Sequence, residues 1–227
     1  MTIRYFTDLV QGTDEWLAAR CGLLTASEMK LIITPTLKTA SNDKERAHLY
    51  ELLAQRITRY VEPAYISDDM LRGREDEIEA RALYAERYAP VREVGFVTND
   101  RWGFTLGYSP DGLVCDDGQI EIKGRRQKYQ IQTITDWTVP ADFVIQIQTG
   151  LLVTERGWCD FLSYSGGLPM LRIRVHPDPK VQDAIVSAAG EFEARIARVH
   201  AEFLERAETS RADLIPTERR IEQEMFA

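Results

Sequence analysis

Residues 109–126, SPDGLVCDDGQIEIKGRR, contain the most informative structural pattern in the chain. Two short apolar runs flank the Asp-Asp-Gly at 116–118, a turn signal that predicts an antiparallel β-hairpin. Side chains two positions apart on a strand point to the same face, so Glu121 and Lys123 project together while their isoleucine neighbours face the core. The hairpin also brings Asp111 to the strand beside Glu121.

This pair of acids with a lysine predicts a metal-assisted hydrolytic site. Two carboxylates from adjacent strands form a hard-oxygen site suited to Mg²⁺ or Mn²⁺, and the carbonyl of Ile122 is close enough to serve as a further ligand. Phosphodiester hydrolysis needs an activated water and positive charge beside the phosphate, which metal and Lys123 can divide between them. The alternative is an exposed hairpin with a Glu–Lys ion pair, and Asp111 favours the site over that alternative.

Upstream of the hairpin, capping residues and apolar spacing predict a helical lobe. Thr13 is a suitable N-cap for a short helix that ends near Gly22, and Pro35 closes a second helix over TASEMKLII. Ser67 and the two aspartates after it predict the start of a further helix. The longer helices are expected over about 43–61 and 67–88.

Downstream of the hairpin, the pattern indicates more sheet and two more helices. Residues 140–154 have a proline at the first turn and predict an apolar helix, although their β-branched content leaves a strand open. Strands are expected at about 157–164 and 169–176, and a long helix with one apolar stripe at about 179–208. The charged tail after Thr209 is expected to be mobile.

Composition narrows the function classes. The chain has 227 residues and a formal charge of −8, which argues against a simple basic DNA-coating protein and fits one domain over 1–227. Its three cysteines and three histidines are scattered, so neither a disulfide framework nor a zinc motif is indicated. The sequence has no phosphate-binding GxxxxGK[ST] loop, which argues against nucleotide hydrolysis. It has neither an apolar run of the roughly 20 residues needed to cross a bilayer nor a signal peptide, so we expect a cytoplasmic protein without membrane contact.

Four motifs together resemble the PD-(D/E)xK nucleases, and within them the lambda-type alkaline exonucleases of phage and prophage recombination. SPDG at 109–112 and EIK at 121–123 are similar to that family's metal-binding core. WLAARCGLLTAS at 16–27 and GREDEIEAR at 73–81 resemble its upstream motifs, so that the resemblance covers about residues 13–154. It implies a restriction-endonuclease-like α/β fold, with a mixed central sheet flanked by helices, a helical N-terminal lobe and a catalytic core over about 67–176.

The resemblance also assigns roles within the centre. It implies that Asp111 and Glu121 bind metal, that Glu77 holds a second Mg²⁺ and that Lys123 acts on the attacking water. Gln146 matches a family glutamine near that water. Two alternatives stay open on the residues alone: the acids around Glu77 could form a solvated helix face, and Gln148 competes with Gln146.

A further set of residues is implied to bind DNA. Arg20 and Ser27 match residues that bind the 5′ phosphate of a DNA end, and Ser109 is a third candidate, although the first two could simply serve as helix-end residues. The sequence departs from the family where Gly-Arg follows the lysine in place of Cys-Pro, and where an aromatic residue expected soon after the glutamine is absent. Basic candidates near this departure are Arg125, Arg126 and Lys128.

The activity that the resemblance implies is Mg²⁺-dependent, 5′-to-3′ digestion of one strand of linear duplex DNA, which leaves 3′ single-stranded tails. It also implies two metal ions per site, a ring-shaped homotrimer and a partner that anneals the exposed strand. Two other functions use the same residues: a sequence-specific endonuclease, and a catalytically silent module that binds DNA ends.

Overall fold

The computed structural model describes residues 2–63 and 67–219, and its central feature is a mixed five-stranded sheet. The sheet order is β3-β6-β7-β8-β9. Strands β6 and β7 form the predicted antiparallel hairpin, β7 and β8 run parallel, and β9 is antiparallel to β8. The bounds of these strands are Val91–Arg92 for β3, Gly112–Val114 for β6, Gly118–Gly124 for β7, Trp158–Tyr164 for β8 and Leu171–Val175 for β9.

A second sheet of four short strands lies beside the N-terminal helices, and it was not predicted. Its order is β1-β4-β5-β2, with β2 parallel to β5 and the other pairs antiparallel. Residues 96–99 and 106–108, which lie just before the hairpin in the chain, belong to this sheet rather than to the one that carries the hairpin. The bounds are Ile3–Phe6 for β1, Leu24–Thr25 for β2, Phe96–Asn99 for β4 and Leu106–Tyr108 for β5.

Seven α-helices occur in the part of the chain that the structure describes. Most match the expected ranges; α5 was not predicted, and residues 140–154 form a helix, which decides between the two alternatives. Two boundaries were wrong: α3 ends at Thr58 because Arg59 turns into the left-handed region (φ 56°), and α2 begins only at Met29 because Thr25 pairs with β5. The bounds are Asp14–Arg20 for α1, Met29–Ile32 for α2, Asp43–Thr58 for α3, Asp68–Arg87 for α4, Gln127–Asp136 for α5, Ala141–Thr154 for α6 and Pro179–Thr209 for α7, followed by a 3-10 turn at Arg211–Asp213.

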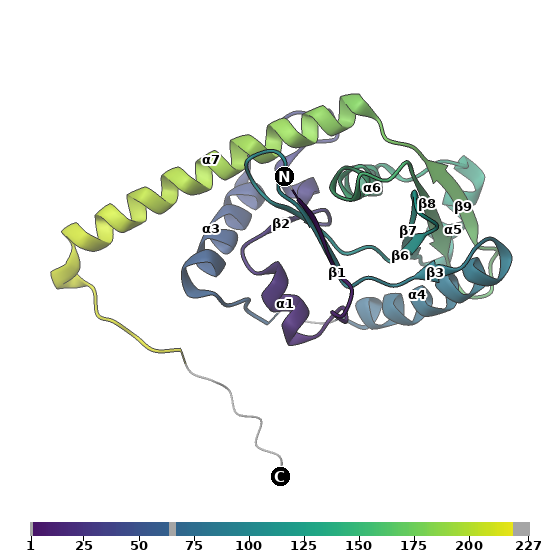
Figure 1. The fold of residues 1–227 in the computed structure, drawn as a ribbon, viewed down its shortest axis with the longest axis horizontal. Helices are drawn as coiled ribbons and strands as arrows, with labels where there is room; N and C mark the ends of the chain where they lie inside the picture. Colours follow the sequence, from purple (N-terminus) through teal and green to yellow (C-terminus); the bar gives the residue numbers. More distant parts are fainter. Residues whose placement is uncertain (1, 64–66, 220–227) are drawn as a thin grey trace, which may run out of the picture.

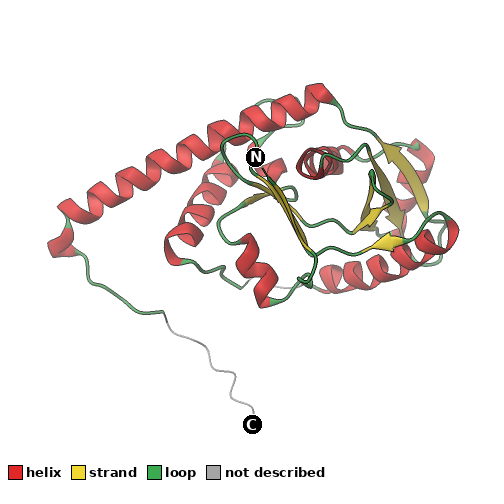
Figure 2. Ribbon diagram, in the orientation of Figure 1, coloured by secondary structure: helices red, strands yellow, loops and turns green. Residues whose placement is uncertain are grey.

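Helix α6 occupies the space between the two sheets (Figures 1 and 2). Ile147 and Leu151 pack with Phe161 of β8, and the helix also lies against β4 and β5. Gly150 allows the closest approach, because a Cβ atom built there would lie 2.7 Å from Cζ of Tyr108. The helix therefore holds both the five-stranded sheet and Tyr108 in fixed positions.

Helix α7 packs against the body of the molecule from its start to about Val199. Asp178 caps its start by accepting hydrogen bonds from the amides of Lys180 and Val181. Arg56 of α3 forms two 2.7 Å hydrogen bonds to Glu193, which join the two helices. The last turns of the helix extend beyond the body of the molecule (Figure 1), and residues 210–219 after it are mostly exposed. The remainder of the charged tail, 220–227, lies outside the described residues.

None of the described helices is both long enough and apolar enough to cross a membrane.

Candidate active site

The three predicted central residues, Asp111, Glu121 and Lys123, lie together at the open end of the hairpin, opposite its turn. The backbone amide of Ile122 donates a 2.6 Å hydrogen bond to Oδ2 of Asp111, which fixes this carboxylate against β7. Glu121 lies beside it and is only 1% exposed. Nζ of Lys123 donates to Oε1 of Glu121 at 2.6 Å. The expected same-face pair is thus present, and it is not an exposed surface ion pair.

Two further side chains hold Glu121. The Tyr108 hydroxyl donates to its Oε2 at 2.9 Å, and Nε2 of Gln146 donates to its Oε1 at 2.6 Å. Gln148 is elsewhere: it donates to the carbonyl of His176 and accepts from the amide of Asp178. Of the two glutamines left open by the sequence, only Gln146 contacts the acidic centre.

Glu77 approaches the centre from α4. It forms an ion pair with Arg81 one helical turn later, and Nε of Arg81 donates at 2.8 Å to the carbonyl of Asp111. Arg81 also pairs with Glu93 at 2.9 Å. Glu79 on the same helix is turned away and accepts from the Tyr164 hydroxyl. Glu77 therefore does not belong to an undifferentiated acidic helix face.

The acids of this centre influence one another. Burial raises the pKa of Asp111 well above its usual range, and the negative charges of Glu121 and Glu77 raise it further. The pKa of Glu77 is raised too, chiefly by burial and against the opposing effect of Arg81. For Lys123, burial lowers the pKa, but the combined attraction of Glu121 and Asp111 outweighs it and leaves the pKa raised. This accumulation of negative charge is what a bound cation would relieve.

The donor set fits a hard divalent cation with few protein ligands. Among the described residues, no three His, Cys, Asp or Glu side chains form a ready-made metal-binding group. Mg²⁺ does not need one, because it usually takes one or two carboxylates and keeps several waters. Asp111 and Glu121, fixed by Ile122 and Gln146, supply two carboxylates of that kind.

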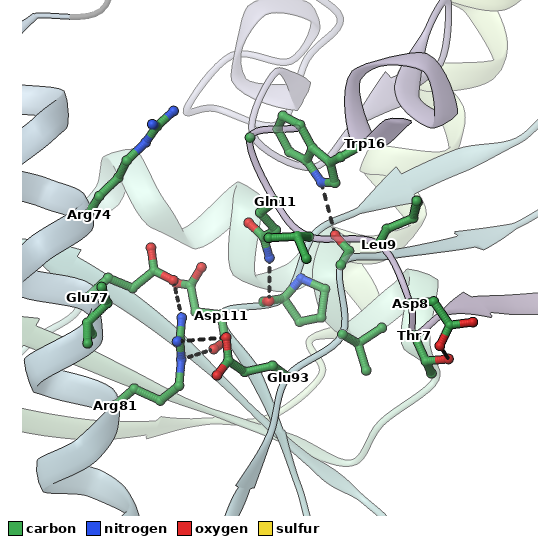
Figure 3. Close-up of a pocket in the computed structure, with 16 residues that line it drawn as sticks. Thr7, Asp8, Leu9, Gln11, Trp16, Arg74, Glu77, Arg81, Glu93 and Asp111 are labelled. Atoms are coloured by element: carbon green, nitrogen blue, oxygen red, sulfur yellow. Dashed lines mark hydrogen bonds and ion pairs between the residues drawn. The ribbon is translucent and has the colours of Figure 1, made fainter. Parts of the chain in front are cut away.

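A cavity of about 480 Å³ is lined by Asp111 and Glu77. Figure 3 shows Glu77, Arg81 and Asp111 together on one wall, with Gln11 and Trp16 contributed by the N-terminal segment. Nε2 of Gln11 donates at 2.9 Å to the carbonyl of Pro110, which anchors that segment next to the hairpin. The cavity is therefore enclosed by α4 on one side and by the loop between β1 and α1 on the other.

Arg20 and Ser109 form a second polar group next to the centre. Nη1 of Arg20 donates to the Ser109 hydroxyl at 3.2 Å, and the Trp16 indole donates to the same hydroxyl at 3.0 Å. Arg20 Nη2 donates to Thr25, whose hydroxyl lies 3.3 Å from that of Ser27. Ser27 thus joins the group through Thr25 rather than by direct contact with Arg20.

The basic candidates after the lysine are on and before α5. The guanidinium carbon of Arg125 lies 5.2 Å from the ring centre of Tyr129 and 5.1 Å from that of Phe143. Arg126 is exposed at the N-cap position of α5, and Lys128 is exposed with Nζ 4.7 Å from the Tyr129 ring. None of the three contacts the acidic centre directly in the described structure.

The family model of the YqaJ-like viral recombinase domain matches residues 15–157, which include every element that carries the acidic centre. The chain belongs to this family. The YqaJ-like match begins just before Trp16 and ends just after α6, so it covers more than half of the chain.

Solved structures agree with the family. The chain is 33% identical to an alkaline exonuclease from Laribacter hongkongensis, with 85% of this chain and 99% of that chain covered and a TM-score of 0.71. A complex of that exonuclease with dAMP matches with the same identity and coverage and a TM-score of 0.72. A phage-related exonuclease from Haemophilus somnus 129PT shares the fold at 14% identity, covering 80% and 96%, with a TM-score of 0.55. No curated protein matches the chain. The YqaJ-like chain is thus similar to a phage-type recombination exonuclease, as the motifs predicted.

Sequence reasoning missed three residues of this YqaJ-like site. Tyr108 holds Glu121, Arg81 links Glu77 to Asp111, and Trp16 shares Ser109 with Arg20. The position of Arg81, four residues after Glu77 on a predicted helix, was a usable signal for an ion pair. Tyr108 gave no such signal, because its contact depends on how β5 packs against β7.

Proposed function

We propose that this protein is a Mg²⁺-dependent exonuclease that digests one strand of linear duplex DNA from its 5′ end and leaves a 3′ single-stranded tail. The observation that carries the proposal is the joint placement of Asp111, Glu121, Lys123 and Gln146 beside the Arg20–Ser109 group. The similarity to an alkaline exonuclease at 33% identity supports the reaction class.

Each residue of the centre has a distinct role in this proposal. Asp111, Glu121 and the carbonyl of Ile122 would hold one Mg²⁺, and Glu77 a second. When bound, Mg²⁺ supplies a Lewis acid that activates water and polarises the phosphoryl group. Manganese would substitute, because it accepts the same oxygen ligands.

Lys123 and Gln146 position the reacting groups. The ammonium of Lys123 stays charged beside Glu121 and stabilises the negative charge that develops on the phosphate. Gln146 uses its amide nitrogen on Glu121, and its amide oxygen accepts no hydrogen bond within the described residues, so it is available to orient the attacking water. Water adds to phosphorus, the bond to the 3′ oxygen breaks, and the departing nucleotide takes a 3′ hydroxyl.

This reaction leaves a new 5′ phosphate on the DNA after every cycle, which accounts for a 5′-phosphate pocket at Arg20, Ser27 and Ser109. Burial lowers the pKa of Arg20, and the charge of Glu28 offsets part of this effect. No carboxylate of the described residues lies within ion-pair distance of the Arg20 guanidinium, whose hydrogen bonds go to hydroxyl groups. A terminal phosphate would supply the missing partner. We expect Arg20→Gln to reduce the preference for 5′-phosphorylated over 5′-hydroxyl ends by roughly 10-fold or more.

The deciding experiment uses purified protein with linear 5′-phosphorylated duplex and with closed circular plasmid, each with Mg²⁺ or with chelator. We expect mononucleotide release from linear DNA only, and only with metal. Label placed at the 5′ end should be released before label placed at the 3′ end. Cleavage of the circle would instead favour the endonuclease, and binding of ends without hydrolysis would favour the silent module.

A Lys123→Ala variant tests the assigned centre. We expect a loss of roughly 100- to 1,000-fold in rate, the usual cost of removing one preorganised donor from a transition state. Retention of full activity by this variant would contradict the proposed centre even if the wild-type protein proves to be an exonuclease.

The proposed assembly is a ring-shaped homotrimer that acts with a strand-annealing partner. The last turns of α7 offer a surface for such contacts, since Phe203 and Leu204 are 48% and 55% exposed. Light scattering should give three times the 26.0 kDa chain mass, and Phe203→Asp should lower it if this surface is used. A monomer at micromolar concentration would refute the ring.

A further inference from the structure

A cationic side chain continues the catalytic face of β7 beyond Lys123. Arg125 follows the last residue of β7, and its backbone amide donates at 2.6 Å to the carbonyl of Tyr164 at the end of β8, so the strand pairing extends to this position. Arg125 therefore points to the same face as Lys123, about 6–7 Å further along the strand.

One aromatic ring links the two cations. Nζ of Lys123 lies 5.5 Å from the ring centre of Phe143, and the guanidinium carbon of Arg125 lies 5.1 Å from it. The Tyr129 ring contacts the guanidinium from α5 at 5.2 Å. Two aromatic contacts from different helices restrict the conformations of Arg125, so little side-chain freedom remains to be lost when it binds an anion.

The guanidinium of Arg125 has no anionic partner in the described structure. Its side chain forms no hydrogen bond or ion pair with any described residue, and its Nε atom is buried without a partner. The charge of Asp142 on α6 influences the pKa of Arg125, but the two side chains form no ion pair. A buried donor without a partner is costly, so a ligand that accepts from it gains the corresponding free energy.

The space beside Arg125 can admit such a ligand. A cavity of about 390 Å³ is lined by Arg125 together with Arg72, Gln127 and Ser165. Asp76 is its one acidic lining residue, and it lies 3.9 Å from the Arg72 guanidinium. The lining is therefore cationic and polar, as a phosphate requires.

We infer that Arg125 binds the backbone phosphate that follows the scissile phosphate on the digested strand, and so positions that strand on Lys123. The inference rests on the proposed exonuclease function. The distance of about 6–7 Å between Arg125 and Lys123 along the strand is close to the separation of neighbouring phosphates on one DNA strand. The three cationic groups then take consecutive phosphates: Arg20 the 5′ terminal one, Lys123 the scissile one and Arg125 the next.

The test introduces one neutral methylphosphonate linkage at a time into the digested strand of a 5′-phosphorylated duplex. For the wild-type protein, we expect kcat/KM to fall roughly 10- to 100-fold when the linkage next to the scissile one is neutral, and to change little when a linkage several nucleotides further is neutral. An active wild-type protein whose rate is the same for all of these positions would overturn the inference. No digestion of the unmodified duplex would overturn the proposed function instead.

Variants then show whether Arg125 is the residue concerned. Arg125→Gln should lose a similar factor on unmodified DNA and should be insensitive to the neutral linkage, because the same interaction is already missing. Arg125→Lys should recover part of the rate on unmodified DNA and part of the sensitivity to the neutral linkage. Lys180→Gln, which removes a charge at the start of α7, should behave as wild type in both measurements. If the neutral linkage slows Arg125→Gln by a further factor as large as in the wild-type protein, another group binds this phosphate. A wild-type rate for Arg125→Gln on unmodified DNA would show the same.

Discussion

Gln146 and Gln148 are two residues apart on α6, and exchanging either for methionine should have opposite consequences. Methionine keeps the length of the side chain and the helix propensity but removes the amide. Gln146 donates to the buried Glu121 carboxylate, whereas Gln148 bridges the carbonyl of His176 and the amide of Asp178. One change removes a contact within the acidic centre, and the other removes a connection between α6 and the start of α7.

The magnitudes follow from the charges of the partners. A hydrogen bond to a charged group contributes about 1.5–3 kcal/mol, so Gln146→Met should reduce the rate of DNA digestion roughly 10- to 100-fold. Gln148→Met loses two neutral hydrogen bonds whose backbone partners can turn to water, a cost of about 1–3 kcal/mol in the free energy of unfolding. For a chain of this size, that cost lowers the melting temperature by roughly 3–10 °C.

The assay pairs single-turnover digestion of a linear duplex with thermal unfolding of the same preparations. We expect Gln146→Met to be slow with a melting temperature near that of wild type, and Gln148→Met to be active well below its own melting temperature but less stable. If both variants lose activity equally at unchanged stability, the contact between Gln146 and Glu121 is not what matters. If only Gln148→Met loses activity, the placement of α6 against β7 is wrong.

Three further predictions follow from the same structure. Asp111→Asn should raise the melting temperature of the metal-free protein at pH 8 while abolishing digestion. The folded-state pKa of Asp111 lies above the unfolded value, because of burial and then of Glu121 and Glu77, so its ionisation costs stability as the pH rises; a lower melting temperature would contradict this. For Asp160 the net pKa shift is in the other direction, because burial raises its pKa but hydrogen bonds from Arg174 and Tyr84 outweigh burial and lower it. The contribution of Asp160 to stability is therefore present at neutral pH and is lost as the pH falls through its folded-state pKa. Asp160→Asn should therefore reduce stability by about 3–5 kcal/mol at pH 7 and by less at pH 3, which lies below the unfolded-state value, measured by urea unfolding at both pH values. Gly150→Ala should cost about 1–3 kcal/mol and slow digestion, because the new Cβ lies 2.7 Å from Tyr108, which holds Glu121, whereas Gly190→Ala in α7 meets only an ordinary 3.5 Å contact and should be neutral or stabilising in melting experiments.

The hairpin of the centre could be predicted because its information is local. The turn residues, the alternation of isoleucines and the two-residue spacing of Glu121 and Lys123 all lie within one short segment, and β6 and β7 pair as that segment requires. The four-stranded sheet is different, because β1 pairs only with β4, 90 or more residues away, and β2 is two residues long. Pairings of this kind depend on tertiary packing, which no local pattern encodes.

Helix α5 shows how tertiary contacts override a weak local pattern. Its sequence QKYQIQTITD has β-branched residues at four positions, and no side chain caps its start, so propensity and capping rules gave no helix. What holds it is Gln130, which is fully buried and donates to the carbonyls of Ser163 and Pro169. A polar residue is an anchor here because β8 and the loop after it present those carbonyls, and that arrangement exists only in the folded chain.

The two glutamines of α6 mark the limit of sequence reasoning within the site itself. Residues two apart on a helix point to roughly opposite sides, so the sequence establishes that Gln146 and Gln148 cannot share a partner. It cannot decide which of them faces the acids, since both faces of α6 are buried and both glutamines have polar neighbours to satisfy. The decision is made by β7 on one side and by the residues before α7 on the other. The same packing that gives Gln146 its place beside Glu121 therefore determines the catalytic geometry, and a change in that packing should alter activity without any change to the acids themselves.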